Sequence, residues 1–269
     1  MWERLTTIWD LLEARGLNPD DLRVLRDSPA GPALVLGAGF GIVAEALRQS
    51  GCAPVYGLDQ AATMARSAHD RRGIETVVGV GAALPFRDGC LATVLIPTGV
   101  LEALGHGERL AIVGEAKRVA NRGATLLLSL FRPSGSGAAM GRELGYIVGQ
   151  TQRNDRMMEL WVHCGDRAGQ IRHVARWLRC DADEAAARLD RWYAGLQFLY
   201  GFFNKIAARL EQAGEEPQDF LRRWWAMPVA GVAEAEIREL LSAASLVPRT
   251  DSFDPRRSLW LLACRAGSS

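Results

Sequence analysis

Three glycines at alternate positions separate a short apolar run from a helix-forming segment. The run is Ala33 to Leu36, the glycines are Gly37, Gly39 and Gly41, and the helix-forming segment begins at Ile42. Four apolar residues in a row are typical of a strand that is buried on both faces. At a turn between a strand and a helix, backbone N–H groups and the positive end of the helix dipole favour an anionic or electron-rich ligand. Glycine lets such a ligand approach the main chain closely, so the stretch predicts a ligand-binding turn.

A carboxylate follows this turn at a spacing that suggests nucleoside binding. Asp59 lies 18 residues beyond Gly41, at the end of a second predicted strand at 54–59. In dinucleotide and nucleoside folds, a carboxylate at the tip of the second strand accepts hydrogen bonds from a ribose. The alternative is an N-cap for the helix expected over 61–68, and one Asp can serve both purposes.

The residue after the third glycine argues against a nicotinamide cofactor. The dinucleotide fingerprint needs a glycine three residues after its second glycine. This chain has Ile42 at that position. A nicotinamide-dependent dehydrogenase is therefore the weaker prediction.

A second group of chemically capable side chains lies further along. His163, Cys164, His173 and Cys180 fall within 18 residues. Zinc ligands usually come in close pairs such as C-x-x-C, and this spacing matches none of those pairs, so we predict no metal site. His163 is a candidate general base, because an imidazole titrates near neutral pH and can take the proton of a hydroxyl or amine.

The elements that must position the glycine turn alternate between strand and helix. Strands are expected at 33–36, 54–59, 75–80, 91–96 and 124–131, with helices at 42–49, 61–68 and 107–120 among them. This alternation predicts a parallel, doubly wound sheet that binds its ligand at the carboxyl ends of the strands.

Four motifs of this region occur in a characteristic order. The glycine turn of 34–41 is followed by Gly57-Leu58-Asp59, then by the segment 83–89, and then by the segment 115–124 before a strand. Over residues 32–132 this series resembles the class I S-adenosylmethionine-dependent methyltransferases. Residues 232–246 resemble the helix before the last two strands of that family, which would lie at 247–253 and 259–264. The resemblance implies an α/β fold with a doubly wound, mostly parallel seven-stranded sheet, helices on both faces and an antiparallel last strand.

The resemblance also implies S-adenosylmethionine as the cofactor and a role for particular positions. The implied contacts are Gly37, Ala38, Gly39 and Gly41 for the methionine end, Asp59 for the ribose, Gln60 and Met64 along the adenine, Gly81, Ala82, Ala83 and Leu84 on its other side, and Pro97, Thr98 and Val100 facing the sulfonium. Glu102 and His106 follow closely and are further candidates for proton transfer.

Three positions depart from the family pattern. The family usually has an acidic residue where this chain has Val35, and often has one at the positions of Gly81 and Ala92. A hydrogen bond to a charged group contributes roughly 1.5–3 kcal/mol, so the loss of these carboxylates is expected to lower cofactor affinity unless water or neighbouring groups compensate.

About 100 residues separate the two parts of the family core. We expect an N-terminal helical segment at 1–31, a cofactor-binding core at 32–132, a helical insertion or cap at 133–231 and the rest of the core at 232–269. Helices are expected at 2–15, 139–150, 166–178, 183–213 and 217–226. The long one would have Asp181 or Asp183 as its N-cap and Gly214 just past its end.

The insertion is rich in aromatic residues. Twelve of the twenty aromatic residues of the chain fall between Tyr146 and Trp225. They suit the core of a small helical cap, a surface that accepts a flat or apolar molecule, or both. Peripheral contact with a membrane is a further alternative for the helix expected over 183–213, whose middle at 192–203 is apolar on every side.

Composition narrows the partners and the compartment. The net charge of +1 argues against a nucleic-acid-binding protein. The five cysteines form no C-x-x-C pair, no signal peptide opens the chain, and no apolar run is long enough to span a bilayer. We therefore expect a cytoplasmic protein. It is expected to be a monomer or a homodimer, and composition does not distinguish the two.

Together the motifs predict an S-adenosylmethionine-dependent methyltransferase that acts on an apolar or aromatic small molecule at O, N or C. The alternatives are an enzyme that uses the same cofactor for another reaction, and a catalytically silent protein that binds a ligand or a partner.

Overall fold

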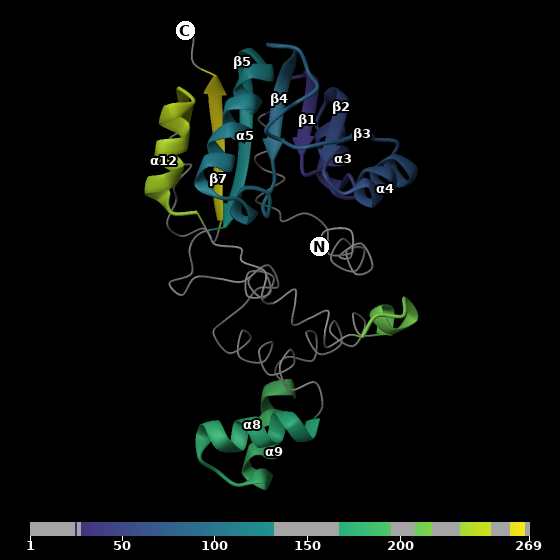
Figure 1. Cartoon of the computed structure of the whole chain (residues 1–269), viewed down its shortest axis with the longest axis vertical. Helices are drawn as coiled ribbons and strands as arrows, with labels where there is room; N and C mark the ends of the chain where they lie inside the picture. The colour runs from purple at the N-terminus through teal and green to yellow at the C-terminus, as the bar shows by residue number, and fades with distance from the viewer. Residues whose placement is uncertain are drawn as a thin grey trace. The chain divides into compact units, whose positions relative to one another are not determined.

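The strands of the α/β part are short apolar runs, and they join into one seven-stranded sheet (Figure 1). The computed structural model describes residues 25, 28–131, 167–194, 208–216, 232–248 and 259–266. The chain divides into two compact units. One comprises 1–6, 12–137 and 230–269 and contains the sheet, and the other comprises 7–11 and 138–229.

In chain order the elements of the first unit are β1 (Gly31–Leu36), α3 (Ile42–Gln49), β2 (Cys52–Asp59), α4 (Ala62–Arg72), β3 (Glu75–Val78), β4 (Leu91–Ile96), the short 3-10 helix η1 (Leu101–Ala103), α5 (His106–Val119), β5 (Ala120–Phe131), α12 (Glu234–Ala243), β6 (Leu246–Pro248) and β7 (Leu259–Ala266).

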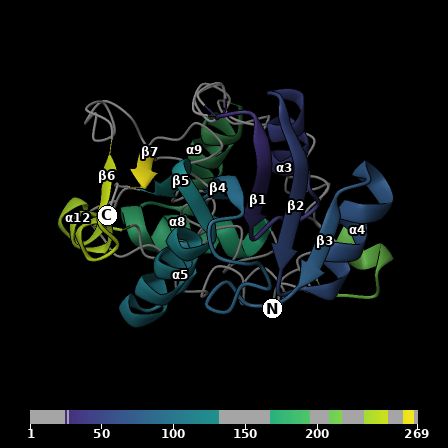
Figure 2. The ribbon, with the colours of Figure 1, turned by 90° about the horizontal axis from the view of Figure 1, so that it is seen from above.

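The strand order is β3-β2-β1-β4-β5-β7-β6. Strands β1 to β5 are parallel, whereas β7 is antiparallel to both β5 and β6. The predicted doubly wound, mostly parallel sheet with an antiparallel last strand is confirmed. The chain winds from β1 outward to β3 and then returns to β4 on the other side of β1, and Figure 2 shows this order from above.

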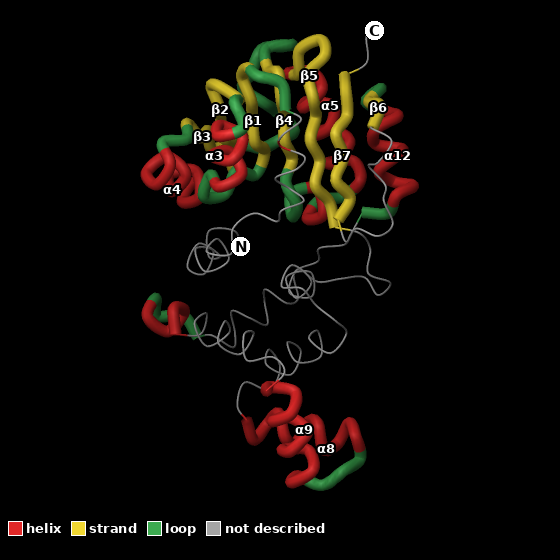
Figure 3. Tube along the Cα trace, turned by 180° about the vertical axis from the view of Figure 1, so that it is seen from behind, coloured by secondary structure: helices red, strands yellow, loops and turns green. Residues whose placement is uncertain are grey.

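The side chains of β1 point alternately to the two faces of the sheet, and each face has its own buried cluster. Leu34 and Leu36 belong to one buried cluster, which includes residues of α5 and α12. Ala33 and Val35 belong to another, which includes residues of α3 and α4. Successive side chains of a strand point to opposite faces, so helices must cover both. Figures 1 and 3 show the sheet and these helices from opposite sides.

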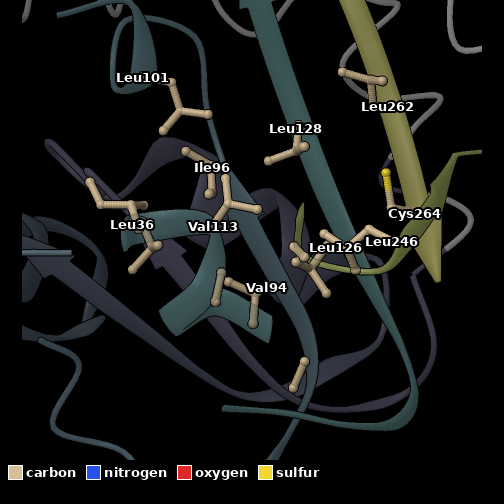
Figure 4. Close-up of a cluster of buried hydrophobic side chains, with 14 of the residues drawn as sticks. Leu36, Val94, Ile96, Leu101, Val113, Leu126, Leu128, Leu246, Leu262 and Cys264 are labelled. Carbon is tan, nitrogen blue, oxygen red and sulfur yellow. The ribbon is translucent and has the colours of Figure 1, made fainter. Parts of the chain in front are cut away.

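The larger cluster holds the strands that carry the expected site. Figure 4 shows Leu36 of β1, Val94 and Ile96 of β4, and Val113 of α5 gathered in it. Each of the four is almost fully buried. Burial of a side chain of this size contributes about 1.5–3 kcal/mol to the free energy of unfolding. The packing of this cluster therefore stabilises the positions at which β1 and β4 end.

Several strand ends differ from the sequence-based prediction: β1 and β2 each begin two residues earlier, at Gly31 and Cys52, and β7 ends two residues later, at Ala266. Strand β5 begins at Ala120 rather than at 124, because Ala120 already pairs with Leu91 and the register then shifts before Thr93 pairs with Thr125. Strand β3 ends at Val78 rather than at residue 80. The next amide, of Gly79, turns to donate to the carbonyl of Asp59 at 3.0 Å.

The described part of the second unit is helical. Helices α8 (Arg167–Leu178) and α9 (Ala182–Ala194) pack through the buried side chains of Val174, Ala185 and Leu189. Of the two predicted N-caps, Asp181 is the one observed, since its Oδ1 accepts the amide of Glu184 at 2.8 Å. Residues 208–212 are helical again.

Several predicted helices lie outside the described residues. These are the segments 2–15, 139–150 and 217–226, and the part of 183–213 that covers 195–207. Among the helices that the structure describes, none is long and apolar enough to cross a membrane.

Candidate cofactor site

The strand order reverses between β1 and β4, and ligands of doubly wound sheets bind where the carboxyl ends of such strands part. The turn of residues 37–41 follows β1, and the loop of residues 97–100 follows β4. The two segments touch, because a side chain added at Gly37 would collide with Val100. Gly37 also has a φ of +69°, which favours glycine.

The glycine turn is fastened to the end of β2. The amides of Gly37 and Ala38 both donate to the carbonyl of Leu58, at 2.7 and 3.1 Å. The amide of Gly39 donates to Oδ2 of Asp59 at 2.8 Å. These amides of the turn are therefore used inside the protein rather than left for a ligand.

Of the remaining amides in the glycine turn and in the first turn of α3, one is hydrogen-bonded within the protein and four find no acceptor among the described residues. The amide of Gly41, the N-cap of α3, donates to the carbonyl of Ala38 at 2.8 Å. In the part of the chain that the structure describes, no protein acceptor is found for the amides of Phe40, Ile42, Val43 and Ala44. These four are the donors that remain for an anionic ligand at the positive end of the helix dipole.

Asp59 is buried, and its carboxylate joins two loops. Besides Oδ2 on Gly39, its Oδ1 accepts the amide of Ala61 at 2.9 Å. Helix α4 has Ala61 at its N-cap, and the amide of that residue is the one that Asp59 accepts. A carboxylate at the end of the second strand of a doubly wound sheet is at the place of the predicted ribose contact.

The residues expected along the adenine fall into exposed and buried groups. Gln60, Ala82 and Ala83 are exposed, whereas Met64 on α4 and Leu84 are buried. Leu84 belongs to the core cluster beneath α5. Exposed Ala82 and Ala83 are therefore better placed to meet a ligand than Leu84 is.

A network of side chains that the sequence did not reveal holds the loop of residues 84–88. Arg118 donates to both carboxylate oxygens of Glu115, to Asp88, and to the carbonyls of Leu84 and Phe86. Glu115 in turn accepts the amide of Leu84 at 2.8 Å. These contacts hold the pKa of Glu115 at about 2, chiefly through the hydrogen bonds from Arg118 and then from Leu84. Glu115 and Arg118 belong to the segment 115–124 of the sequence analysis. Nothing in the spacing of these two residues indicates that their partners lie about 30 residues earlier in the chain.

The loop after β4 is tied down by two polar contacts. The hydroxyl of Thr98 lies 2.7 Å from that of Ser129 on β5. Glu102, on η1, is buried, and its Oε2 accepts the amide of Gly99 at 2.9 Å. Glu102 thus shapes the loop of residues 97–100, a role that its place in the sequence did not reveal.

His106 points to α12. Its Nδ1 lies 3.3 Å from Glu236 and its Nε2 lies 3.6 Å from Glu239. The buried side chain of Arg109 donates to Glu236 at 2.6 Å and to the carbonyl of Leu101 at 2.8 Å. Burial raises the pKa of Glu236, but the hydrogen bonds from Arg109 and His106 outweigh it, and the net pKa lies below its usual value. Both ring nitrogens of His106 therefore face carboxylates that join α5 to α12.

Apolar packing occupies the three positions where the family has carboxylates. Val35 is fully buried in the cluster beneath α3. A side chain at Gly81 would meet Ile112 of α5 at 3.2 Å, and Ala92 lies against Gly31, where an added Cβ would come within 3.0 Å of it. Apolar side chains lie next to these three positions, and a carboxylate buried among them would need a partner.

The remaining candidates lie beyond what the structure describes. His163 and Cys164 fall outside the described residues, whereas His173 lies on α8. Among the residues that are described, no group of three or more His, Cys, Asp or Glu side chains is arranged to hold a metal ion.

Comparison with known proteins agrees with this architecture. Residues 34–128 match a family described as "Methyltransferase domain". A comparison with curated proteins found no match. Among solved structures, an S-adenosylmethionine-dependent methyltransferase from Methanosarcina mazei is 15% identical with a TM-score of 0.52, over 94% of this chain and 100% of that one.

Other solved structures match a smaller part. A methyltransferase from Streptomyces caelestis is 24% identical with a TM-score of 0.39, over 46% of this chain and 58% of that one. An S-adenosylmethionine-dependent methyltransferase from Thermotoga maritima is 21% identical with a TM-score of 0.41, over 49% of this chain. This chain spans 60% of the length of the Thermotoga protein.

The glycine turn, the carboxylate at the end of β2 and the match to the methyltransferase domain all lie within residues 34–128. Residues 34–128 are thus similar to a methyltransferase domain, and the seven-stranded sheet has the fold of the methyltransferase from Methanosarcina mazei.

Proposed function

We propose that the whole protein transfers the methyl group of S-adenosylmethionine to an O, N or C atom of an apolar or aromatic small molecule. The observation that carries the proposal is the contact between the turn of residues 37–41 and the loop of residues 97–100 at the point where the strand order reverses. This is where doubly wound sheets bind their ligands.

The residues present fit the chemistry of that cofactor. Its methionine carboxylate suits the amides of Phe40, Ile42, Val43 and Ala44, which have no acceptor among the described residues. Its ribose hydroxyls suit the carboxylate of Asp59, which stands at the end of the second strand of a doubly wound sheet. We assign the adenine to the side of Gln60, Ala82 and Ala83, and the sulfonium to Pro97, Thr98 and Val100.

When bound, the cofactor supplies an electrophilic methyl group on a positively charged sulfur. The protein then contributes orientation and exclusion of water. Asp59 and the free amides of the turn hold the two ends of the cofactor. Glu102 holds the loop of residues 97–100 in place through Gly99. In-line attack then requires the acceptor to lie on the side of the methyl group away from the sulfur.

Proton removal from a hydroxyl or amine acceptor needs a base. Two of the three candidate bases are already bound to other parts of the protein. The ring of His106 is engaged with α12, and Glu102 is engaged with Gly99. We therefore assign a structural role to both, and His163 remains the candidate general base.

The acceptor class rests on composition. Twelve of twenty aromatic residues fall between Tyr146 and Trp225, which favours an apolar or aromatic acceptor. We place the reaction in the cytoplasm, since the five cysteines form no C-x-x-C pair.

Isothermal titration with S-adenosylmethionine tests the first step. We expect binding by the parent and loss of binding in Asp59→Ala. Absence of heat and of any thermal shift for the parent would overturn the proposal. Incubation of the protein with aromatic hydroxyl and amine compounds, followed by mass spectrometry, then tests the acceptor class. A product that carries one added methyl group supports it, whereas a product without that mass supports the use of the cofactor for another reaction.

A catalytically silent binding protein is the second candidate. The loss of carboxylates at Val35, Gly81 and Ala92 favours it, because fewer groups then hold the cofactor. Tight binding of an apolar ligand with no turnover of any acceptor would support this candidate over the enzyme.

A further inference from the structure

The residue between the second and third glycines of the turn is held from outside the turn. The carbonyl of Phe40 accepts a hydrogen bond from Nη1 of Arg72 at 2.9 Å. Arg72 is the last residue of α4, and its side chain is 18% exposed. Its Nε lies 3.0 Å from a carboxylate oxygen of Glu45, which belongs to the first turn of α3. One guanidinium therefore reaches the glycine turn and the helix that follows it.

Close packing of α4 against the turn makes this reach possible. A side chain added at Gly41 would lie 3.1 Å from Ala68 of α4 and 3.4 Å from Ile74. The neighbouring Arg71 lies over the ring of Phe40, with its guanidinium carbon 5.0 Å from the ring centre. The end of α4 thus holds both the main chain and the side chain of Phe40.

The hydrogen bond from Arg72 fixes a particular peptide plane. The peptide that joins Phe40 to Gly41 has its N–H bonded to the carbonyl of Ala38 at 2.8 Å. Its C=O is bonded to Arg72. The peptide that joins Ala38 to Gly39 is likewise bonded at both ends, by Asp59 and by Gly41. Between these two fixed planes lies one peptide, whose N–H belongs to Phe40 and has no acceptor among the described residues.

We infer that Arg72 is a positioning residue for the cofactor, which acts by holding the amide of Phe40 and the first amides of α3 toward the methionine carboxylate. The inference rests on the proposed function, because it needs S-adenosylmethionine in the site. A glycine-rich turn without such a fixed peptide samples several conformations, and binding must then select one of them. Arg72 removes that cost before the cofactor arrives.

Two ligands separate this role from a general loosening of the fold. S-adenosylmethionine carries the amino-acid carboxylate, whereas 5′-methylthioadenosine carries the nucleoside without it. Arg72→Met retains much of the apolar stem and removes the donors. We expect its affinity for S-adenosylmethionine to fall about tenfold, the scale of one lost hydrogen bond from a charged donor. Affinity for 5′-methylthioadenosine should stay within about twofold of the parent value.

A matched control exists on α3. Arg48 also faces Glu45, at 3.7 Å, but among the described residues it is Arg72, not Arg48, that donates to the carbonyl of Phe40, and Arg48 is the more exposed of the two. Arg48→Met removes the same charge from the same carboxylate and should bind both ligands as the parent does. Should Arg72→Met fail to fold, Arg72→Lys gives the same comparison, because one ammonium group cannot serve Phe40 and Glu45 together.

Calorimetric titration of the full chain and these variants decides the matter. Equal loss for both ligands in the Arg72 variant, or no loss for either, would overturn the positioning role. A parent that binds neither ligand would overturn the proposed function itself and this inference with it. Loss confined to S-adenosylmethionine in the Arg72 variant, with none in Arg48→Met, is the expected result.

Discussion

The contact between Gly37 and Val100 gives a sharp test of the candidate site, because it joins the loops that follow β1 and β4. Gly37→Ala has two separate costs. The backbone φ of +69° is unfavourable for any residue with a Cβ, at about 1–2 kcal/mol. The new Cβ would also collide with the Val100 side chain, and overpacking of this kind costs about 1–3 kcal/mol.

Only the second cost depends on Val100. In the double variant Gly37→Ala/Val100→Ala the collision disappears, while the backbone cost stays. We therefore expect the two substitutions to be coupled by about 1–3 kcal/mol in the free energy of unfolding, with the double variant more stable than the sum of the single effects predicts. Val100→Ala alone should cost about 1 kcal/mol, since this side chain is only partly buried against the core.

Urea unfolding of the four proteins without cofactor measures this coupling, and titration with S-adenosylmethionine measures its effect on the site. The affinity should fall at least about tenfold in Gly37→Ala and recover partly in the double variant. A coupling below about 0.5 kcal/mol is the size expected for independent sites. Such a result would refute the close approach of the two loops and with it the geometry on which the proposed function depends.

Three further substitutions test separate parts of the structure. The pKa of Glu115 is held at about 2, below its usual 4.5, so its stabilisation is full above pH 4.5 and is lost as the pH falls toward 2. Glu115→Gln should therefore cost about 1 kcal/mol at pH 7, after allowance for solvent screening, and less at pH 3, as measured by chemical denaturation at both pH values. Asp59→Asn places an amide donor against the amide of Gly39 or Ala61 and should cost about 1–3 kcal/mol without cofactor, whereas an unchanged melting temperature would limit Asp59 to ligand binding. Asp181→Ala removes the N-cap of α9 and should cost about 1 kcal/mol, and unchanged amide exchange at Glu184 would contradict that role.

Local patterns were sufficient to predict most of the fold. Strand β4 has the predicted bounds, because six residues, all apolar except Thr93, stand between Cys90 and Pro97 and are buried on both faces. The prediction of β5 failed at its start for a physical reason. The segment 121–123 has the composition of a turn, and Gly123 has a φ of +84°, but the ladder resumes on both sides of it. A turn signal does not reveal whether pairing continues beyond it.

The candidate site was predictable in outline and not in its hydrogen bonds. Spacing alone placed Asp59 beside the glycine turn, but not its two bonds to Gly39 and Ala61. The pattern predicts that backbone amides of the turn meet the ligand, and the structure assigns those of Gly37 and Gly39 to β2, whereas that of Phe40 has no acceptor among the described residues. Which amides are bonded within the protein depends on contacts between residues 20 or more positions apart in the sequence, and the periodicity of a segment does not predict such contacts.

The loss of the carboxylate at position 35 leads to a final prediction. Val35 is fully buried beside Ala33, Ala44 and Leu47, in the cluster beneath α3. The turn that follows is instead fastened by Asp59 at the end of β2 and from α4. Restoring the carboxylate of the family through Val35→Asp therefore buries a charge among hydrocarbon side chains.

The expected cost of Val35→Asp is at least about 3 kcal/mol at pH 7, and it should shrink as the pH falls and the new carboxyl is protonated, because burial raises its pKa. Chemical denaturation at pH 7 and pH 5 measures the loss of stability and its dependence on pH. Val35→Thr, which replaces one methyl group by a hydroxyl at nearly constant volume, is the control for polarity without charge. If Val35→Asp instead kept the parent stability and bound S-adenosylmethionine more tightly, the position would face the cofactor, and the apolar core beneath α3 would not be the reason for the departure from the family.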